Sequence, residues 1–140
     1  MELSLAVVGA GPVGLALALQ AARALPEARV TVFDARPAEA DIGRDPRTLA
    51  LSLGSVQELE RLGVWDAIAP RSAAIRAVHV SQQQPALLAA AARLPQPELR
   101  LTAAECGVGQ LGAVVAYGAL LAPLQAAWLA AMAAEPQRLA

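Results

Sequence analysis

Glycines near the start of the chain are spaced so that they could bind a phosphate group. They form one short turn after an apolar segment, made of Gly9, Ala10, Gly11, Pro12, Val13 and Gly14. In a G-x-G-x-x-G turn the first glycine permits the tight bend, the second lets the backbone approach the phosphates, and the third lets a helix pack closely on the preceding strand. The N–H groups and the partial positive charge at the start of that helix favour a bound pyrophosphate.

An acidic residue lies at the distance that such a site requires. Asp34 follows Gly14 by 20 residues and comes directly after the segment RVTVF. A carboxylate at the end of the second strand can accept hydrogen bonds from ribose hydroxyls, and it would repel the additional phosphate of NADP. The pattern predicts a dinucleotide site that disfavours NADP, with FAD and NAD both open. In the alternative interpretation the glycines serve close packing alone and Asp34 is a solvated strand end.

Three elements must position these residues, and they form one right-handed β-α-β crossover. The apolar run Leu3–Val8 predicts a central parallel strand buried on both faces. A helix is expected at Pro12–Leu25, where the first turn tolerates proline, and a second strand at Arg29–Phe33. The fold class predicted is α/β, a Rossmann-like dinucleotide-binding domain with a parallel sheet, and residues 1–140 are expected to form a single domain.

The rest of the chain predicts shorter elements. They are a loop at Pro37–Pro46, a strand at Thr48–Ser52, a helix at Leu53–Leu62 that ends at Gly63, strands at Ile75–Ser81 and Glu98–Thr102, an irregular connection at Gln82–Pro97, a strand near Ala113–Ala116 and a helix from about Gly118 to Ala134.

Composition excludes several classes of function. Hydrophobic residues make up 56% of the chain and charged residues 16%, which argues against disorder. The formal net charge of −1 and the lack of a basic cluster argue against a nucleic-acid partner. The single cysteine, Cys106, excludes an internal disulfide and a cysteine-based metal site, so we expect no metal and a cytoplasmic location. The apolar stretch 111–134 is best explained by a strand and a buried helix, with peripheral contact to the inner membrane as the alternative.

Three further segments closely resemble the FAD-dependent aromatic hydroxylases, in particular the branch that hydroxylates polyprenyl phenols in ubiquinone biosynthesis, the octaprenyl-methoxyphenol hydroxylases. These segments are DPRTLALS from Asp45, LERLGVW from Leu59 and IRAVHVS from Ile75. The resemblance implies FAD as cofactor, NAD(P)H as reductant, O2 as co-substrate and a small aromatic substrate. It also implies contact with other proteins of quinone biosynthesis as an alternative partner interaction.

The resemblance further implies roles for individual residues. It places Gly9, Gly11 and Gly14 on the FAD pyrophosphate, Asp34 on the adenosine ribose and Arg47 near the pyrophosphate, where its charge would complement the phosphates. Arg36 is expected near the adenine. The alternatives are a structural Arg47 that caps a loop and a solvated Arg36 in a turn.

The sequence departs from the family pattern at several positions, and these differences limit which roles can be carried over. Residues Gln82–Pro97 replace a shorter Asp- and Gly-containing turn, and Tyr117 stands where relatives often carry an Asn or Gln that contacts the flavin. The later flavin-contacting segments and the substrate-binding sheet of the family have no counterpart. We therefore expect an N-terminal part that supplies the ADP-binding half of the FAD site, contains no catalytic residue (His79 being structural) and is inactive alone. Another FAD or NAD oxidoreductase of this fold, or a non-catalytic nucleotide-binding fragment, remains an alternative.

Overall fold

The computed structural model describes residues 3–37, 42, 45, 47–81 and 98–140. Its first three elements are β1 (Ser4–Val8), α1 (Pro12–Ala24) and β2 (Arg29–Phe33), and the two strands pair in parallel. This is the β-α-β crossover that the sequence predicts, and it confirms the α/β, Rossmann-like fold class. The predicted loop at Pro37–Pro46 lies mostly outside the described residues, and the predicted connection at Gln82–Pro97 lies wholly outside them.

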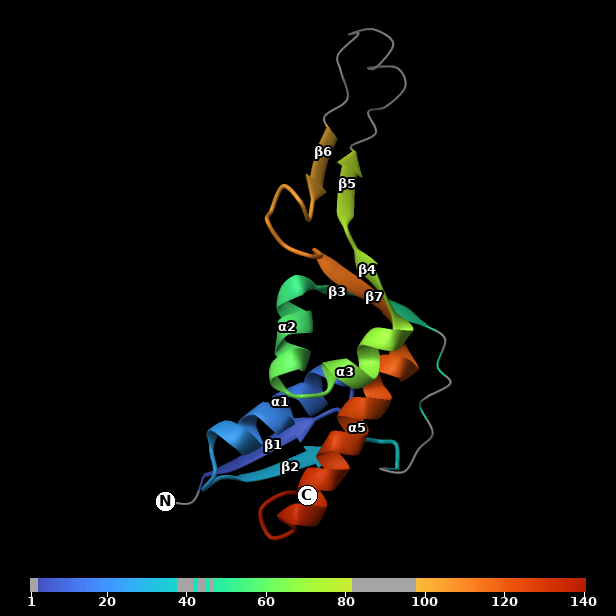
Figure 1. Ribbon diagram of the computed structural model, residues 1–140. Coiled ribbons are helices and arrows are strands. Elements are labelled where there is room, and N and C mark those ends of the chain that lie inside the picture. Colours follow the sequence, from blue (N-terminus) through green and yellow to red (C-terminus); the bar gives the residue numbers. More distant parts are fainter. Residues whose placement is uncertain (1–2, 38–41, 43–44, 46, 82–97) are drawn as a thin grey trace, which may run out of the picture.

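The second part of the chain contains antiparallel sheets and a long helix, which begins directly after the last strand (Figure 1). Its elements are β3 (Thr48–Ser52), α2 (Leu53–Arg61), α3 (Trp65–Ile68), the 3₁₀ turn η1 (Ala69–Arg71), β4 (Ser72–Ile75), β5 (Ala77–Ser81), β6 (Glu98–Thr102), β7 (Gly112–Ala116) and α5 (Tyr117–Ala134). Strand β7 is central in the sheet β3-β7-β4, while β5 and β6 form a separate two-stranded ribbon. Figure 1 shows this ribbon extending away from the remainder of the molecule.

The predicted single strand at Ile75–Ser81 is in fact two strands with different partners. Strand β4 ends at Ile75, which pairs with Gly112 of β7, whereas β5 begins at Ala77, which pairs with Thr102 of β6. Between them, the carbonyl of Arg76 accepts a hydrogen bond from Ala103 N–H at 2.8 Å. The alternating pattern was recognised correctly, but a change of partner between consecutive strands leaves no mark on side-chain alternation.

The hydrophobic core lies between α1, α5 and one face of the β1-β2 sheet. Strand residues in this core are Val7 and Val30, with Leu5 and Val32 partly buried against it. Helix α5 is long and apolar enough to cross a membrane by length and composition alone. However, one side of α5 belongs to this same core, where the side chains of Leu120, Leu121, Leu124 and Trp128 are at most 4% exposed. The arrangement matches the buried helix that was predicted for this stretch.

The opposite face of the β1-β2 sheet is open, contrary to the prediction that Leu3–Val8 is buried on both faces. Val8 is 86% exposed and its partner in the register, Phe33, is 54% exposed. Side chains alternate between the two faces of a strand, so Val7 and Val30 share the covered face while Val8 and Phe33 share the open one. The prediction was wrong for the described residues because α1 and α5 both lie on the same face.

Residues 138–140 close the outer edge of β2 and the end of α1. Val30 and Val32 N–H groups donate to the carbonyls of Arg138 and Ala140 at 2.9 and 2.7 Å. The Arg138 guanidinium donates to three carbonyls at the end of α1 and in the turn after it, those of Ala22, Leu25 and Ala28, at 3.1 to 3.3 Å. The last carbonyls of a helix have no intrahelical donor, and an arginine can satisfy them. Arg138 thus caps α1 from 113 positions away in the chain.

Replacing Arg138 should therefore destabilise the whole crossover. We expect Arg138→Ala to lower the midpoint of thermal unfolding by several degrees, measured by circular dichroism. Arg61→Ala is the matched control, because the Arg61 side chain is 69% exposed and its partner is the surface residue Glu58; surface ion pairs contribute little to stability. Equal midpoints for the two variants would contradict the capping role.

Candidate functional site

The three glycines of the turn have different structural reasons to be glycine. Gly9 has φ +104°, a left-handed conformation that residues with a side chain rarely adopt. A Cβ on Gly14 would stand 1.8 Å from the carbonyl oxygen of Gly9, so any side chain there would separate α1 from β1. Gly11 differs from both, because it has φ −78° and a Cβ on it would meet the Tyr117 hydroxyl oxygen at an ordinary 3.6 Å. The fold requires Gly9 and Gly14 but does not require Gly11.

The start of α1 offers backbone N–H donors. Gly11 is the N-cap and supplies no side-chain cap, and the first turn carries no acidic residue. Pro12 occupies the first helical position, where a missing N–H costs nothing, and Val13 is 82% exposed. The initial N–H groups of a helix have no intrahelical acceptor and carry partial positive charge. The turn therefore presents free N–H donors and partial positive charge to solvent, which are the features that suit an anion.

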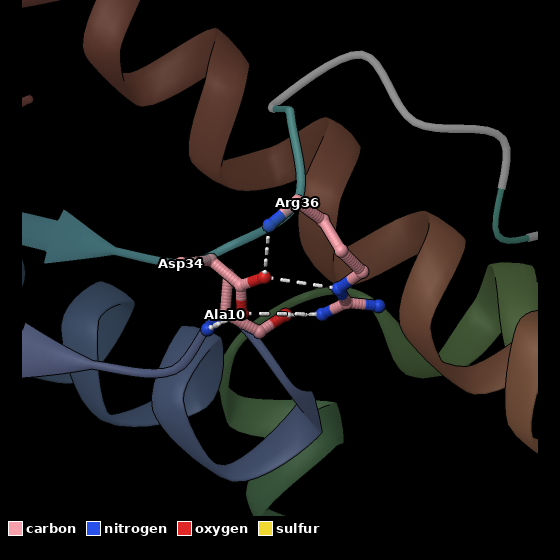
Figure 2. Close-up of polar contacts among 3 residues, drawn as sticks. All are labelled: Ala10, Asp34 and Arg36. Carbon is pink, nitrogen blue, oxygen red and sulfur yellow. Dashed lines mark hydrogen bonds and ion pairs between the residues drawn. The ribbon is translucent and has the colours of Figure 1, made fainter.

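Asp34 joins the end of β2 to the glycine turn (Figure 2). Its Oδ2 accepts the Ala10 N–H at 2.7 Å, and its Oδ1 accepts the Arg36 N–H at 2.8 Å and Arg36 Nε at 3.0 Å. Arg36 Nη2 lies 3.3 Å from both Asp34 Oδ2 and the carbonyl oxygen of Ala10. A carboxylate has about four acceptor positions, so these donors fill it. A ribose diol that binds Asp34 must replace some of the hydrogen bonds that Arg36 makes.

The same contacts determine the charge of Asp34. The Arg36 guanidinium, with the N–H groups of Arg36 and Ala10, holds the pKa of the Asp34 carboxyl well below its usual range. In turn Asp34 raises the pKa of Arg36, with a smaller contribution from Tyr117. Both groups are therefore ionised at neutral pH. Because the pair is neutral overall, Arg36 reduces the repulsion that Asp34 alone would exert on a second phosphate.

A cavity of about 250 Å³ lies beside this ion pair. Asp34 and Arg36 form its polar edge, and side chains from β2 and from the outer part of α5 form its apolar wall. The apolar members include Val32, Trp128, Leu129 and Met132. An apolar pocket with a few convergent polar groups is the usual form of a small-molecule site. The combination suits a nucleoside, whose base has flat faces that can pack against apolar side chains and whose sugar offers hydroxyl groups.

Arg47 reaches the same end of the molecule from the segment before β3. Its guanidinium lies 2.6 Å from Asp45 Oδ2 and 4.6 Å from the centroid of the Tyr117 ring. The backbone is fixed there too, since the Tyr117 N–H donates to the Arg47 carbonyl at 2.5 Å and the Gly118 N–H to the Asp45 carbonyl at 3.3 Å. The Arg47 side chain remains 71% exposed. Arg47 is thus both a structural contact of α5 and an accessible cation.

The structure brings together residues that the sequence could only propose separately. Gly11, Arg36 and Arg47 all lie around Tyr117, which the sequence marked only as a departure from the family. His79, in contrast, lies on the exposed β5-β6 ribbon, 3.4 Å from Glu98. Within the described residues no cluster of three or more His, Cys, Asp or Glu side chains could hold a metal ion.

Comparison with known proteins agrees with this geometry. The family model of an NAD(P)-binding Rossmann-like domain matches residues 7–39. The chain also resembles the crystal structure of p-nitrophenol 4-monooxygenase from Pseudomonas putida DLL-E4, with 20% identity and a TM-score of 0.58, over 93% of this chain and 30% of that one. A peptidyl tryptophan dihydroxylase essential for tryptophylquinone cofactor biogenesis matches with 18% identity and a TM-score of 0.43, over 91% of this chain and 23% of that one.

These matches establish a class of fold. The family model and the first structural match show a nucleotide-binding, Rossmann-like fold. The chain spans less than a third of the length of either solved structure.

The different roles of Gly11 and Gly14 can be separated by substitution. We expect Gly14→Ala to lower the free energy of unfolding by at least about 3 kcal/mol, because its methyl group would overlap the Gly9 carbonyl. Gly11→Ala should lower it by no more than about 1 kcal/mol, because the new methyl group meets no close neighbour and the main cost is a poorer N-cap residue. Urea unfolding measures both. A strongly destabilised Gly11→Ala variant would contradict the assignment.

The Asp34 carboxylate should stabilise the fold in a pH-dependent way. Its pKa in the folded chain lies below the ordinary value of 3.8, so its stabilising contribution is complete above that value and is lost as pH falls through the lower folded pKa. We expect Asp34→Asn to unfold at a lower temperature than the parent chain from neutral pH down to about pH 5. The difference should shrink below the ordinary value of 3.8. A difference that stays constant on acidification would contradict this role.

Proposed function

We propose that this chain binds the ADP half of FAD and is the N-terminal part of an FAD-dependent monooxygenase that hydroxylates an aromatic ring with NAD(P)H and O2. The observation that carries the proposal is that the glycine turn, which we propose binds phosphate, is hydrogen-bonded to Asp34, which we propose binds the ribose. Ala10 N–H joins the two directly, at 2.7 Å from Asp34 Oδ2. Gly11 also supports the proposal, because the described fold leaves room for a Cβ there and so gives no packing reason for a glycine.

The residues present fit the ADP half of FAD part by part. The pyrophosphate would lie at the start of α1, between Gly9 and Gly14, where a Cβ on Gly11 would enter the approach to the backbone. The ribose hydroxyls would donate hydrogen bonds to the Asp34 carboxylate, and the adenine would enter the cavity beside Val32 and Trp128. Arg47, with its exposed guanidinium, would complement the phosphate charge.

In such an enzyme the residues described here would bind and orient the cofactor. The flavin would supply the redox chemistry, namely reduction by NAD(P)H and transfer of an oxygen atom from O2 to the ring. No described side chain is assigned a catalytic acid or base role. The sequence resemblance supports a polyprenyl phenol of ubiquinone biosynthesis as the substrate, and a cytoplasmic location with peripheral contact to the inner membrane or to other proteins of quinone biosynthesis. We further propose that residues 1–140 alone have no monooxygenase activity.

A second candidate is another oxidoreductase of this fold that binds a nicotinamide dinucleotide. The family model that matches residues 7–39 is described as NAD(P)-binding, which favours this candidate. The pairing of Arg36 with Asp34 also bears on it, because a guanidinium beside the ribose acid can accept a 2′-phosphate. The two candidates differ in which ligand binds more tightly.

Ligand-observed NMR titration of the 140-residue chain tests the proposal, because it detects weak binding. We expect ADP and FAD to bind with similar affinity, weaker than about 10 µM, and NADP to bind more weakly still. Gly11→Ala should abolish ADP binding in a folded protein, while Gly109→Ala, which places a methyl group in open space, should leave it unchanged. NAD(P)H consumption should stay at the level of buffer. Failure of the parent chain to bind ADP would overturn the proposal, and preference for NADP would favour the second candidate.

A further inference from the structure

We propose that Tyr117 is a further dinucleotide-binding residue, whose hydroxyl donates a hydrogen bond to the pyrophosphate and whose ring holds Arg47 in place. The inference rests on the proposed binding of an ADP-containing cofactor. It concerns the residue at which the three separate parts of the site meet: the glycine turn, Arg36 and Arg47.

The position of Tyr117 is fixed by the backbone. It is the first residue of α5, and its N–H donates to the Arg47 carbonyl at 2.5 Å. The next two residues, Gly118 and Ala119, are buried, so the first turn of α5 is held in the interior. The half-buried Tyr117 side chain is thereby directed toward the start of α1, where its hydroxyl oxygen lies 3.6 Å from the position of a Gly11 Cβ.

This distance places the hydroxyl on the side of Gly11 that the absent side chain leaves open. A pyrophosphate that approaches the backbone at Gly11 must pass within hydrogen-bonding reach of the phenol. Tyrosine can donate through its O–H while its oxygen accepts from another group. Hydrogen bonds to an anion are roughly twice as strong as those between neutral groups. The phenol is therefore placed to meet a phosphate oxygen.

The two arginines explain why an additional neutral donor is useful. Arg36 and Arg47 each have their own carboxylate, Asp34 and Asp45, so neither pair carries net charge. Arg36 also interacts with the Tyr117 hydroxyl, which is a minor contributor to its raised pKa behind Asp34. The Tyr117 hydroxyl is uncharged and can donate its proton to a phosphate oxygen. Arg47 stacks on the ring at 4.6 Å, a cation–π contact that orients both side chains.

A hydroxyl that blocks the ligand would have the opposite effect on affinity to a hydroxyl that binds it. If the hydroxyl merely fills the space beside Gly11, the ligand has to displace it, and its removal would tighten binding. The two roles therefore differ in the sign of the effect of a single oxygen atom.

Tyr117→Phe removes that oxygen and keeps the ring under Arg47. We expect this variant to bind ADP and FAD about 10-fold more weakly than the parent chain, with unchanged affinity for adenosine, which has no phosphate. Tyr117→Leu should lower the affinity for ADP and FAD further, because Arg47 then has no aromatic ring to stack on. Arg61→Ala, on the far end of α2, is the control and should bind as the parent does. Ligand-observed NMR measures all four chains, and thermal unfolding checks that each is folded.

Tyr117 is the single tyrosine of the chain, so it can also be observed without substitution. In protein labelled with 3-fluorotyrosine, the one ¹⁹F resonance should shift when inorganic pyrophosphate or ADP is added and should stay in place with adenosine. Unchanged or tighter ADP binding by Tyr117→Phe, or a resonance indifferent to pyrophosphate while ADP binds, would overturn this inference and leave the proposed function intact. Failure of the parent chain to bind ADP or FAD would overturn both.

Discussion

The close contact between the Gly9 carbonyl and the α-carbon of Gly14 is the constraint on which this molecule depends. There is no room for a methyl group between them, and this sets how tightly α1 packs against the end of β1. With α1 at that distance, the Ala10 N–H in the turn donates a hydrogen bond to Asp34 at the end of β2. The geometry of the glycine turn, the place of Asp34 beside it and the first part of the core thus all depend on a single backbone contact.

Residues of the site divide into those that the fold also uses and those that it does not. Asp34 fastens the turn to β2, and Arg47 fastens the segment before β3 to α5, so each has structural work besides any contact with a ligand. Gly11 and the Tyr117 hydroxyl contribute little to packing, yet they face each other across the approach to the turn. Groups that a fold does not need, gathered at one place, are a stronger indication of binding than groups that stabilise it.

Local patterns in the sequence were sufficient for the crossover and for most later elements. The spacing of Gly9, Gly11, Gly14 and Asp34 predicted one site because those residues are linked by a single strand-helix-strand unit. Sequence reasoning failed where the answer depends on distant segments. It could not tell that β1 has one open face, that Arg76 separates two strands, or that Arg138 caps α1, since each depends on which distant element packs there. The meeting of Gly11, Arg36 and Arg47 around Tyr117 could not be predicted for the same reason, because these residues come from separate stretches of the chain.

The pairing of β2 with residues 138–140 has a consequence for how the chain folds during synthesis. The unit that a family model matches, residues 7–39, is made early, but its outer strand edge and the end of its helix are completed by residues made about a hundred positions later. Contacts of such long sequence separation form slowly, and an uncovered strand edge is prone to associate with other chains in the meantime. In the nascent chain β2 therefore remains an uncovered strand edge until residues 138–140 have been synthesised and have paired with it.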